Sequence, residues 1–521
     1  MKQQILKLLS EVLPTVDFKS DFLFAELDSL GVATILYFLS DKYGISLDAT
    51  DVTPKNFKSL DSLTRMVEGK IREKFLSSHK TLEESIRDFA SSQPDRTAAV
   101  CGNDSISYSA LWDRIIERAE DLRASGLKPR RPYVFRASQD IDFLVTYCAV
   151  HYLKAIAVPL EHAATEENFN AVEKEALENQ FAPDIADILY TTGTTGKSKG
   201  VMLSETALVS CADNFINDLH FSSDLLFIIS GPLNHIASLF KIHPVLTVGG
   251  TVCILDGLKD MNAFFDVFDL PFKKFGTFMV PASLRLIMQF SYKRLAGLAD
   301  RIDFIETGAA PITQADMEQL SKALPHSRLY NTYGGTEIGA VCTYDFNDGR
   351  YMEGCIGRPM KNSSVEVTPE GNVIVSGLTI MSGYVADEAE TAKVIQDGKI
   401  HGADLGYVDD EGMIHLTGRA GDVINVGGFK VNPVEVENAA SFHPSVKDCI
   451  CIAAQHPIIG TVLKLLVVTN DGEELDRHGL AVYLKSKLEP FKVPAYYEAV
   501  DSIQRTYNGK IDRKYYRDNV Q

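Results

Sequence analysis

The sequence has little cysteine, one tryptophan and no long apolar run: its eight cysteines are scattered over 521 residues. The closest cysteine pair, Cys449 and Cys451, lies in VKDCICIAAQ, whose alternation predicts a buried strand rather than a metal or redox site. Because no run of about 18 apolar residues occurs, we expect no helix that inserts into a membrane. The opening MKQQILKLLSEVLP lacks the apolar core and cleavage site of a secretion signal, so we expect a cytoplasmic protein.

Positive charge is also scarce, since the formal net charge is -18 at pH 7. This excess of acidic residues argues against binding to nucleic acid or to anionic membrane surfaces, although a local basic pocket for phosphates remains open. A composition with 45% hydrophobic and 23% charged residues is that of an ordinary globular protein. We therefore expect small molecules or other proteins as partners, and not nucleic acid.

The length exceeds what one hydrophobic core serves, so several domains are expected. Apolar periodicity predicts a small helical bundle over residues 1–75, followed by a polar linker over 76–84. Strands then alternate with helices, which predicts a large α/β domain with layered sheets over 85–419, including a β-rich part with a hairpin at VEVTPEGNVIVSG. The remaining residues, 420–521, mix both types and predict a small α+β domain.

The glycine-rich and threonine-rich stretch TTGTTGKSKG, residues 191–200, follows the strand-like ADILY. It would therefore lie at the carboxyl end of a strand, where open α/β sheets bind ligands. Its glycines free backbone N–H groups, and its hydroxyls and lysines add donors and positive charge, which suits phosphates. The alternative is a flexible surface loop. The nucleotide-binding candidates here are Thr191, Thr192, Gly193, Thr194, Thr195, Gly196, Lys197 and Lys199.

YTTGTTGKSKGV resembles the signature loop of the adenylate-forming superfamily, which contains acyl-CoA and aryl-CoA synthetases and the adenylation domains of nonribosomal peptide synthetases. The resemblance implies that this loop holds the β and γ phosphates of ATP. One departure is Ser198, which stands where the family usually has proline. The resemblance further implies that the small domain is a lid over the large one.

Two further stretches match the family in order. YNTYGGTEIG resembles the Y-G-x-T-E motif, which implies Tyr333 against adenine, Thr336 at the α-phosphate and Glu337 as a Mg2+ ligand. ETGAAP resembles the stretch of small residues that flanks the nucleotide and the acyl pocket. In isolation, each could be an ordinary loop. The implied nucleotide-binding residues are Gly308, Ala309, Ala310, Asn331, Thr332, Tyr333 and Gly334, with Gly335 at the substrate pocket.

The carboxy-terminal part carries three more resemblances. HGADLGYVDDEG is similar to the T-G-D-L-G motif and implies that Asp404 binds both ribose hydroxyls. LTGRAGDVINVGGFKV implies that Arg419 reaches the ribose and phosphate and that Gly421 is the hinge between the domains. RTYNGKIDRK implies that Lys510 is the catalytic lysine, acting with Thr336 and Glu337.

The first residues resemble a different family. FAELDSLGVATILYFLSDKYGISL is similar to acyl or peptidyl carrier proteins, which implies that Ser29 carries covalent 4'-phosphopantetheine. A phosphopantetheinyl transferase and downstream carrier-dependent enzymes would then be partners. A second D-S-L contains Ser62, which we expect to be structural or exposed. A helical interaction module is the alternative for residues 1–75.

The acid is suggested by GPLNHIASLF, which is similar to the P-L-x-H segment of acyl-CoA and aryl-CoA synthetases and places His235 at the pocket mouth. This favours an apolar aliphatic or aryl acid over an α-amino acid, although His235 could also be a packed core histidine. Only about 26 residues separate AIAVPL from DILYTTG, fewer than the family ordinarily has. We therefore expect a shortened distal subdomain in the large domain.

These resemblances imply a ligase that uses ATP and Mg2+ to convert a carboxylic acid to an acyl-adenylate. The acyl group would pass to the phosphopantetheine thiol on Ser29 or on another carrier. One alternative is an acyl-CoA or aryl-CoA ligase that uses free CoA. Another is a non-catalytic carrier or scaffold with a vestigial adenylation fold.

Overall fold

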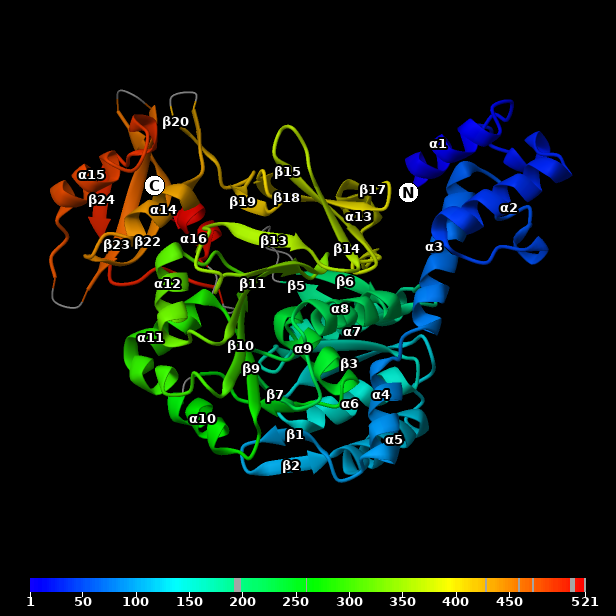
Figure 1. Cartoon of the computed structure of the whole chain (residues 1–521), viewed down its shortest axis with the longest axis horizontal. Coiled ribbons are helices and arrows are strands. Elements are labelled where there is room, and N and C mark those ends of the chain that lie inside the picture. The colour runs from blue at the N-terminus through cyan, green and yellow to red at the C-terminus, as the bar shows by residue number, and fades with distance from the viewer. Residues whose placement is uncertain are drawn as a thin grey trace.

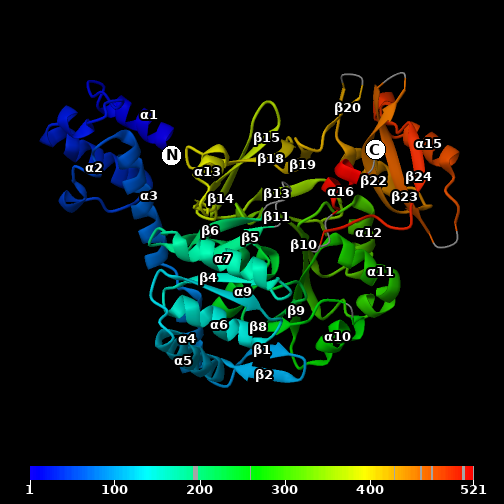
Figure 2. The same cartoon turned by 180° about the vertical axis from the view of Figure 1, so that it is seen from behind.

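The structure is a computed structural model of the chain, shown from opposite sides in Figures 1 and 2. It describes residues 1–191, 198–258, 260–426, 429–457, 460–470, 473–506 and 511–519, without the side chains of Lys430 and Asp518. A small helical unit at the amino terminus and a small carboxy-terminal unit lie at opposite ends of a large layered core (Figure 1). Within the described residues, no helix is long and apolar enough to cross a membrane.

The amino-terminal unit has a hydrophobic core of its own. Apolar side chains at helical spacing meet in the middle of the unit, and Ile5, Leu9, Ile35, Leu39 and Leu63 are fully buried there. Helices therefore form where the apolar periodicity predicts them. The elements are α1 (Lys2–Val12), η1 (Leu23–Glu26), α2 (Ser29–Tyr43), η2 (Ala49–Asp51) and α3 (Leu60–Ser77).

The large core alternates helices and sheets. Its smaller sheet has the strand order β16-β6-β5-β4-β3, with β3, β4 and β5 parallel. Helix α7 covers one face of this sheet, and α6, α8 and α9 cover the other face and separate it from the larger sheet. The elements are α4 (Leu82–Ser92), α5 (Tyr108–Ala124), β3 (Pro132–Ala137), α6 (Ile141–Tyr152), β4 (Ile156–Glu161), α7 (Glu166–Glu178), β5 (Ile185–Thr191), β6 (Lys199–Ser204), α8 (Glu205–Asp218), α9 (Ile236–Thr247) and β16 (Gly383–Tyr384).

The larger sheet runs through the middle of the core, and its far face is covered by α10, α11 and α12. Strands β7, β9, β10 and β11 are parallel neighbours, so their carboxyl ends reach the same edge. The elements are β1 (Thr97–Cys101), β2 (Asp104–Ser107), β7 (Leu225–Ile229), β8 (Thr251–Ile254), α10 (Met261–Asp266), η3 (Val267–Asp269), β9 (Lys274–Met279), α11 (Pro281–Ala296), β10 (Ile302–Gly308), α12 (Gln314–Ala323), β11 (Arg328–Gly335) and β12 (Gly339–Asp345).

The same sheet continues into the predicted β-rich part, where antiparallel strands lie beyond the edge of the parallel ones. The predicted hairpin at VEVTPEGNVIVSG is confirmed as β14 paired with β15. The elements are β13 (Cys355–Pro359), β14 (Ser363–Val367), β15 (Asn372–Gly377), α13 (Glu388–Val394), β17 (Ile395–Gln396), β18 (Lys399–Val408) and β19 (Ile414–Arg419).

The carboxy-terminal unit has a separate sheet, of order β22-β23-β24, with its own hydrophobic core. Cys449 and Cys451 are buried in β22, which confirms the predicted buried strand. The elements are β20 (Ile424–Val426), β21 (Phe429–Val431), α14 (Pro433–Ser441), β22 (Val446–His456), β23 (Gly460–Thr469), α15 (Arg477–Lys485), η4 (Pro490–Lys492), β24 (Tyr496–Ala499) and α16 (Arg513–Asn519).

The predicted linker over 76–84 is helical at both ends, because α3 continues to Ser77 and α4 begins at Leu82. The polar composition of this stretch gave no sign of the helix. Thr81 caps α4 in a capping box with Glu84, which accounts for the sharp start of that helix.

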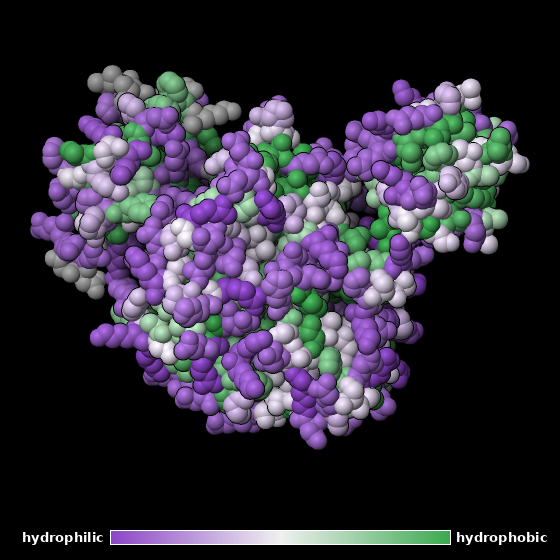
Figure 3. Space-filling model, in the orientation of Figure 1, coloured by the Kyte–Doolittle hydropathy of each residue, from purple (hydrophilic) through white to green (hydrophobic). Residues whose placement is uncertain are grey.

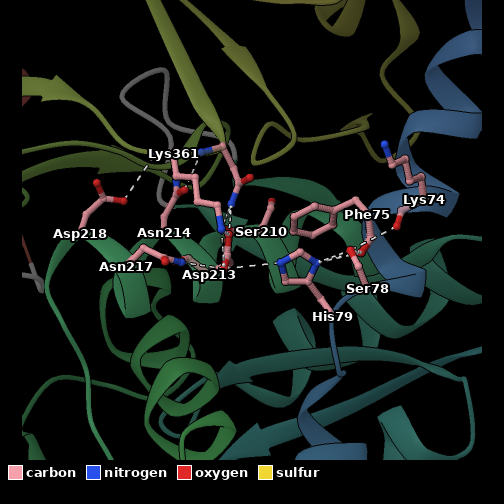
Figure 4. Close-up of polar contacts among 11 residues, drawn as sticks. Lys74, Phe75, Ser78, His79, Ser210, Asp213, Asn214, Asn217, Asp218 and Lys361 are labelled. Atoms are coloured by element: carbon pink, nitrogen blue, oxygen red, sulfur yellow. Dashed lines mark hydrogen bonds and ion pairs between the residues drawn. The ribbon is translucent and has the colours of Figure 1, made fainter. Parts of the chain in front are cut away.

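Polar contacts attach the end of α3 to the large core (Figure 4). Asp213 of α8 lies at their centre: it pairs with His79 at 3.5 Å and with Lys361 at 3.0 Å, and accepts a hydrogen bond from Asn362 at 2.8 Å. Burial acts to raise the pKa of Asp213, but the hydrogen bonds from Asn362 and Lys361 hold that pKa below its usual value. The His79 ring also stacks on Phe75. The amino-terminal unit is therefore bonded to the core through side chains as well as through the chain.

Candidate active site

The carboxyl ends of β10 and β11 form the floor of the candidate site. The two strands are parallel and in register, with Gly308 opposite Thr332. A Cβ atom at Gly308 would collide with the carbonyl oxygen of Thr332, so only glycine fits this close approach. Ala309 follows with a φ of 65°, a conformation that costs free energy for a residue other than glycine and that concentrates at ligand sites. Ala310 is half-buried beside it.

Side chains from three predicted motifs meet next to this edge. The Tyr333 hydroxyl donates to Asp404 Oδ2 at 2.7 Å, and Arg419 Nε donates to Asp404 Oδ1 at 2.8 Å. Asp404 and Arg419 are cross-strand neighbours on β18 and β19, which holds them together. Burial, together with the Asp404 carboxylate, raises the pKa of Tyr333 well above its usual value. The tyrosine is therefore a hydrogen-bond donor at neutral pH, and it fixes the carboxylate.

Glu337 lies in the turn between β11 and β12 and is half-buried. The Tyr384 hydroxyl donates to Glu337 Oε1 at 3.2 Å, and burial together with Glu337 raises the pKa of Tyr384. The main chain of this turn is also held, because the Met381 N–H donates to the Glu337 carbonyl at 2.9 Å. Thr336 precedes it in the same turn and is also half-buried.

The described ends of the 191–200 stretch lie on β5 and β6, where Thr191 is opposite Lys199. The Ser198 hydroxyl donates to the Thr191 carbonyl at 2.8 Å, so the serine found in place of proline closes the base of the loop. Lys199 Nζ lies 2.8 Å from Glu390 Oε1 and 5.0 Å from the centre of the Tyr384 ring. Tyr384 thus links this loop to Glu337.

Other candidate residues make contacts within the fold. Asn331 is buried and donates to the Cys355 carbonyl, and Thr332 lies 3.4 Å from the Thr343 hydroxyl. Gly334 is at a bulge where a Cβ atom would meet the Gly339 carbonyl, whereas Gly335 has room for one. These backbone positions shape the turn that carries Thr336 and Glu337.

Three predicted residues lie apart from this group. His235 is the N-cap of α9 and is half-buried, with Nδ1 accepting a hydrogen bond from the Ala237 N–H at 3.4 Å. Gly421 lies between β19 and β20, at the passage from the core to the carboxy-terminal unit. Ser29 is the first residue of α2 in the amino-terminal unit.

Seven candidates lie outside the described residues: Thr192, Gly193, Thr194, Thr195, Gly196, Lys197 and Lys510.

Sequence reasoning missed several polar groups of the site. Tyr384 and Glu390 belong to none of the motifs found in the sequence. Tyr384 contacts Glu337 and Glu390 contacts Lys199, and the second contact joins distant parts of the chain. Lys241 and Glu306 form a buried ion pair on α9 and β10. A signal was present for Lys241, because its charge interrupts the apolar run IASLFKIHPVL, and Glu306 begins the ETGAAP stretch.

Comparison with known families identifies the fold. The model of the AMP-binding enzymes matches residues 86–177 and 166–385, and that of the AMP-binding enzyme C-terminal domain matches residues 435–510. The chain belongs to the AMP-binding enzyme family. As a member, it is a ligase that forms thioesters through an acyl-AMP intermediate. The family models begin at residue 86, so they leave the amino-terminal unit unassigned.

Individual relatives cover most of this AMP-binding enzyme. The chain is 29% identical to a feruloyl-CoA synthase of Amycolatopsis over 80% of its own length and 94% of that protein. It is 25% identical to the fatty acid–[acyl-carrier-protein] ligase ScoC of Streptomyces coeruleorubidus, over 84% and 96% of the two chains. The crystal structure of ATP-bound MatB from Rhodopseudomonas palustris shares the fold, with a TM-score of 0.75 and 24% identity over 84% of this chain and 99% of that one.

Proposed function

We propose that the protein uses ATP and Mg2+ to activate a carboxylic acid and then transfers the acyl group to the thiol of free CoA. The observation that carries the proposal is the Tyr333–Asp404–Arg419 group beside Gly308 and Glu337, where separate motifs meet at the carboxyl ends of parallel strands. CoA ligases among the relatives support CoA as the acceptor.

In the first step, a carboxylate oxygen of the acid attacks the α-phosphorus of ATP, a C–O–P linkage forms and pyrophosphate leaves. In the second step, the sulfur of the thiol attacks the acyl carbon, AMP leaves and the thiol proton is released. Thr336 and Lys510 would donate hydrogen bonds to α-phosphate oxygens as charge shifts onto them. One such aimed donor is typically worth about 10^2 to 10^3 in rate.

The nucleotide would lie along the edge formed by β10 and β11. Asp404 would accept hydrogen bonds from the ribose hydroxyls, Tyr333 would lie against adenine, and Arg419 would reach the ribose and phosphate. The loop over residues 191–199 would hold the outer phosphates. Lys199 would contact these phosphates from the position in which its ion pair with Glu390 holds it. The other residues that we propose contact the nucleotide are Gly308, Ala309, Ala310, Asn331, Thr332 and Gly334.

Glu337 fits a Mg2+ ion, because a carboxylate is a hard oxygen ligand and Tyr384 fixes its orientation. Within the described part of the chain, no group of three or more His, Cys, Asp or Glu residues could hold a metal ion. This agrees with a Mg2+ ion held by one carboxylate and by phosphate oxygens. When bound, Mg2+ supplies positive charge that offsets the charge of the phosphates.

We assign an aliphatic or aryl acid rather than an α-amino acid to the acyl pocket. The residues of α9 include no carboxylate that could bind an amine. His235 at the start of α9 and Gly335 at the end of β11 would lie at the pocket. The feruloyl-CoA synthase and the fatty acid ligase among the relatives act on acids of these two kinds.

A second candidate acceptor is phosphopantetheine attached to Ser29. Ser29 is exposed at the start of α2, where Asp28 caps the helix by accepting from the Gly31 N–H at 2.7 Å. Figure 3 shows hydrophobic residues at the surface of this unit. Leu30, Tyr37 and Phe22 are exposed at 74%, 66% and 55% of their maximum. A unit that docks on a partner enzyme would present such a surface. A relative that loads a carrier protein also supports this candidate.

The domain limits belong to the same proposal: a carrier-like unit over 1–75, a linker over 76–84, an adenylation domain over 85–419 and a lid over 420–521, with the hinge at Gly421. The short stretch between β4 and β5 would make the distal subdomain smaller than usual. A cytoplasmic location stays a prediction.

Mass spectrometry after incubation with ATP, CoA and candidate acids tests the acceptor. The proposal expects acyl-CoA as the product, at equal yield in wild type and Ser29→Ala. An acyl mass on Ser29 of the phosphopantetheinylated chain, absent from Ser29→Ala, would favour the second candidate. Failure to exchange pyrophosphate into ATP with any acid would favour a non-catalytic scaffold.

A further inference from the structure

A buried ion pair joins α9 to β10 next to the proposed acyl pocket. Lys241 Nζ lies 2.7 Å from Glu306 Oε1, and the two residues are only 2% and 1% exposed. The Lys241 ammonium also lies over the ring of Phe215 at 3.5 Å and faces Phe278 at 5.3 Å. Taking two charges out of water is costly, and apolar residues of the same volume often stabilise a fold at least as well as a buried ion pair does. Stability alone therefore does not account for the pair.

The position of the pair relates it to the acid. Ala237, one helical turn before Lys241, is half-buried, and so are Phe278 of β9 and Ala310 after β10. Lys241 lies about 6 Å further along α9 than Ala237. Glu306 lies two residues before Gly308 on the same face of β10, opposite Phe278. On α9 and just after β10, half-buried residues therefore lie within four residues of the ion pair.

One oxygen of the pair is unsatisfied. Glu306 Oε2 is buried and has no hydrogen-bond partner among the described residues. A buried carboxylate oxygen without a donor is unfavourable, because its hydration has been lost without replacement. Phe278 lies opposite Glu306 on the neighbouring strand β9 and is half-buried. A ligand group that reaches Glu306 Oε2 could donate the hydrogen bond that this oxygen lacks.

The charges of the pair select the kind of donor. Lys241 already neutralises Glu306, so an ammonium group on the acid would add a buried charge without a counter-charge. A second carboxylate would add such a charge too, and it offers no donor. A hydroxyl group is neutral and donates one hydrogen bond, so it satisfies Glu306 Oε2 without adding charge. The apolar walls, which include Phe215 and Phe278, suit the carbon body of the same acid.

We propose that Lys241 and Glu306 determine specificity by binding the far end of the acid, and that the preferred substrate is an aliphatic or aryl acid with a hydroxyl group there. This inference rests on the proposed function, because it places the acyl pocket between α9 and β10. Glu306 Oε2 accepts the substrate hydroxyl, and Lys241 holds the glutamate in position through Oε1.

The test compares matched acids in ATP–pyrophosphate exchange. One series is para-hydroxyphenylacetate, para-methoxyphenylacetate and para-methylphenylacetate, and the other is ω-hydroxyhexanoate, ω-methoxyhexanoate and heptanoate. In each series the end group donates, only accepts, or does neither. Wild type should prefer the hydroxy acid over the methyl acid at least about tenfold in kcat/KM in one of the series, since a site built for a hydroxyl discriminates strongly against its absence.

Two variants remove the feature in different ways. The double variant Lys241→Met/Glu306→Leu replaces the pair by apolar side chains and should fold; it should use the methyl acid at least as well as the hydroxy acid. Glu306→Gln turns the free oxygen into an N–H donor, so the methoxy acid should gain on the methyl acid. Asp303→Asn is the matched control, because it removes the partner of Arg328 at the other end of β10 and should keep the wild-type preference.

A wild type that exchanges pyrophosphate equally well with hydroxy and methyl acids overturns the inference and leaves the proposed function standing. So does a hydroxy preference that survives in the double variant. Absence of exchange with every acid, together with no binding of ATP by calorimetry, contradicts the proposed function itself and the inference with it.

Discussion

At the residue scale, Asp404 is the carboxylate on which the candidate site is organised. Both of its oxygens are engaged, one by Tyr333 and one by Arg419. These partners fix the direction of the carboxylate, so that ribose hydroxyls would find an acceptor that is already in place. Such preorganisation lowers the entropy cost of binding.

Replacing Asp404 by alanine should weaken ATP binding by about tenfold to a hundredfold, because hydrogen bonds to a charged group are worth about 1.5 to 3 kcal/mol. Titration calorimetry with ATP measures the change. Asp409→Ala is the control, since Asp409 pairs with His415 on the same sheet. Equal ATP affinity in the two variants would remove Asp404 from the ribose site.

Gly308 should tolerate no side chain. A Cβ atom there meets the carbonyl oxygen of Thr332, so Gly308→Ala should lower the free energy of unfolding by about 1 to 3 kcal/mol. Gly335→Ala, where the nearest atom would be 3.6 Å away, should change it by much less. Urea unfolding of both variants checks this, and equal losses would show that the close approach of β10 and β11 is unimportant.

At the element scale, the helices with clear caps and apolar periodicity could be predicted from the sequence. Helix α2 (Ser29–Tyr43) lies within the helical bundle predicted over residues 1–75, and Asp28 is its cap. The two D-S-L sequences show the limit of such prediction. Ser29 is exposed, whereas Ser62 is buried and forms a capping box with Ser59. The same three letters therefore begin two helices with serines in different surroundings.

Other parts could not be predicted, because they depend on contacts between distant segments. The extension of α3 to Ser77 is held by neighbours such as Asp213 and Asp184 of the core, which pair with His79 and Arg72. The motif residues Tyr333 and Asp404 could be chosen by resemblance, but the hydrogen bond between them required the pairing of distant strands.

The cap of α2 should support the helix that carries Ser29. Asp28→Ala should destabilise α2 by about 1 kcal/mol, because the Gly31 N–H loses its acceptor. Hydrogen exchange should become faster for the amides of α2 and stay unchanged for those of β10. Thr34→Ala, in the middle of the same helix, serves as the control. Unchanged exchange in Asp28→Ala would mean that packing alone holds the start of α2.

At the scale of the whole molecule, a buried polar network ties the layers of the core together. Tyr147 of α6 lies 2.7 Å from Asp187 of β5 and 2.8 Å from His243 of α9, and His151 lies 2.8 Å from the other Asp187 oxygen. Burial, with the charge of His151, lowers the pKa of His243 from 6.5 to about 4. The charge of Asp187, opposing burial, raises the pKa of His151 above 6.5.

Acid should therefore destabilise the core through His243. In the unfolded chain His243 binds a proton below about pH 6.5, whereas in the folded chain it does so only near pH 4. The free energy of unfolding is therefore unaffected by His243 above this window and falls by up to about 3 kcal/mol as the pH drops through it. His151 is charged in both states there, and its own contribution is lost only as the pH rises through its folded pKa. His243→Gln should flatten the dependence of unfolding free energy on pH in this window. An unchanged slope would contradict the assignment.

The central claim is that two units of this chain cooperate to turn a carboxylate into an acyl-adenylate. ATP–pyrophosphate exchange over a panel of aliphatic and aryl acids, measured for wild type and for Lys510→Ala, tests it most directly. We predict exchange that depends on both the acid and Mg2+, and a loss of about 10^2 to 10^3 in rate for Lys510→Ala with ATP binding retained. Exchange that is absent for every acid, or equally fast in the variant, would contradict the account.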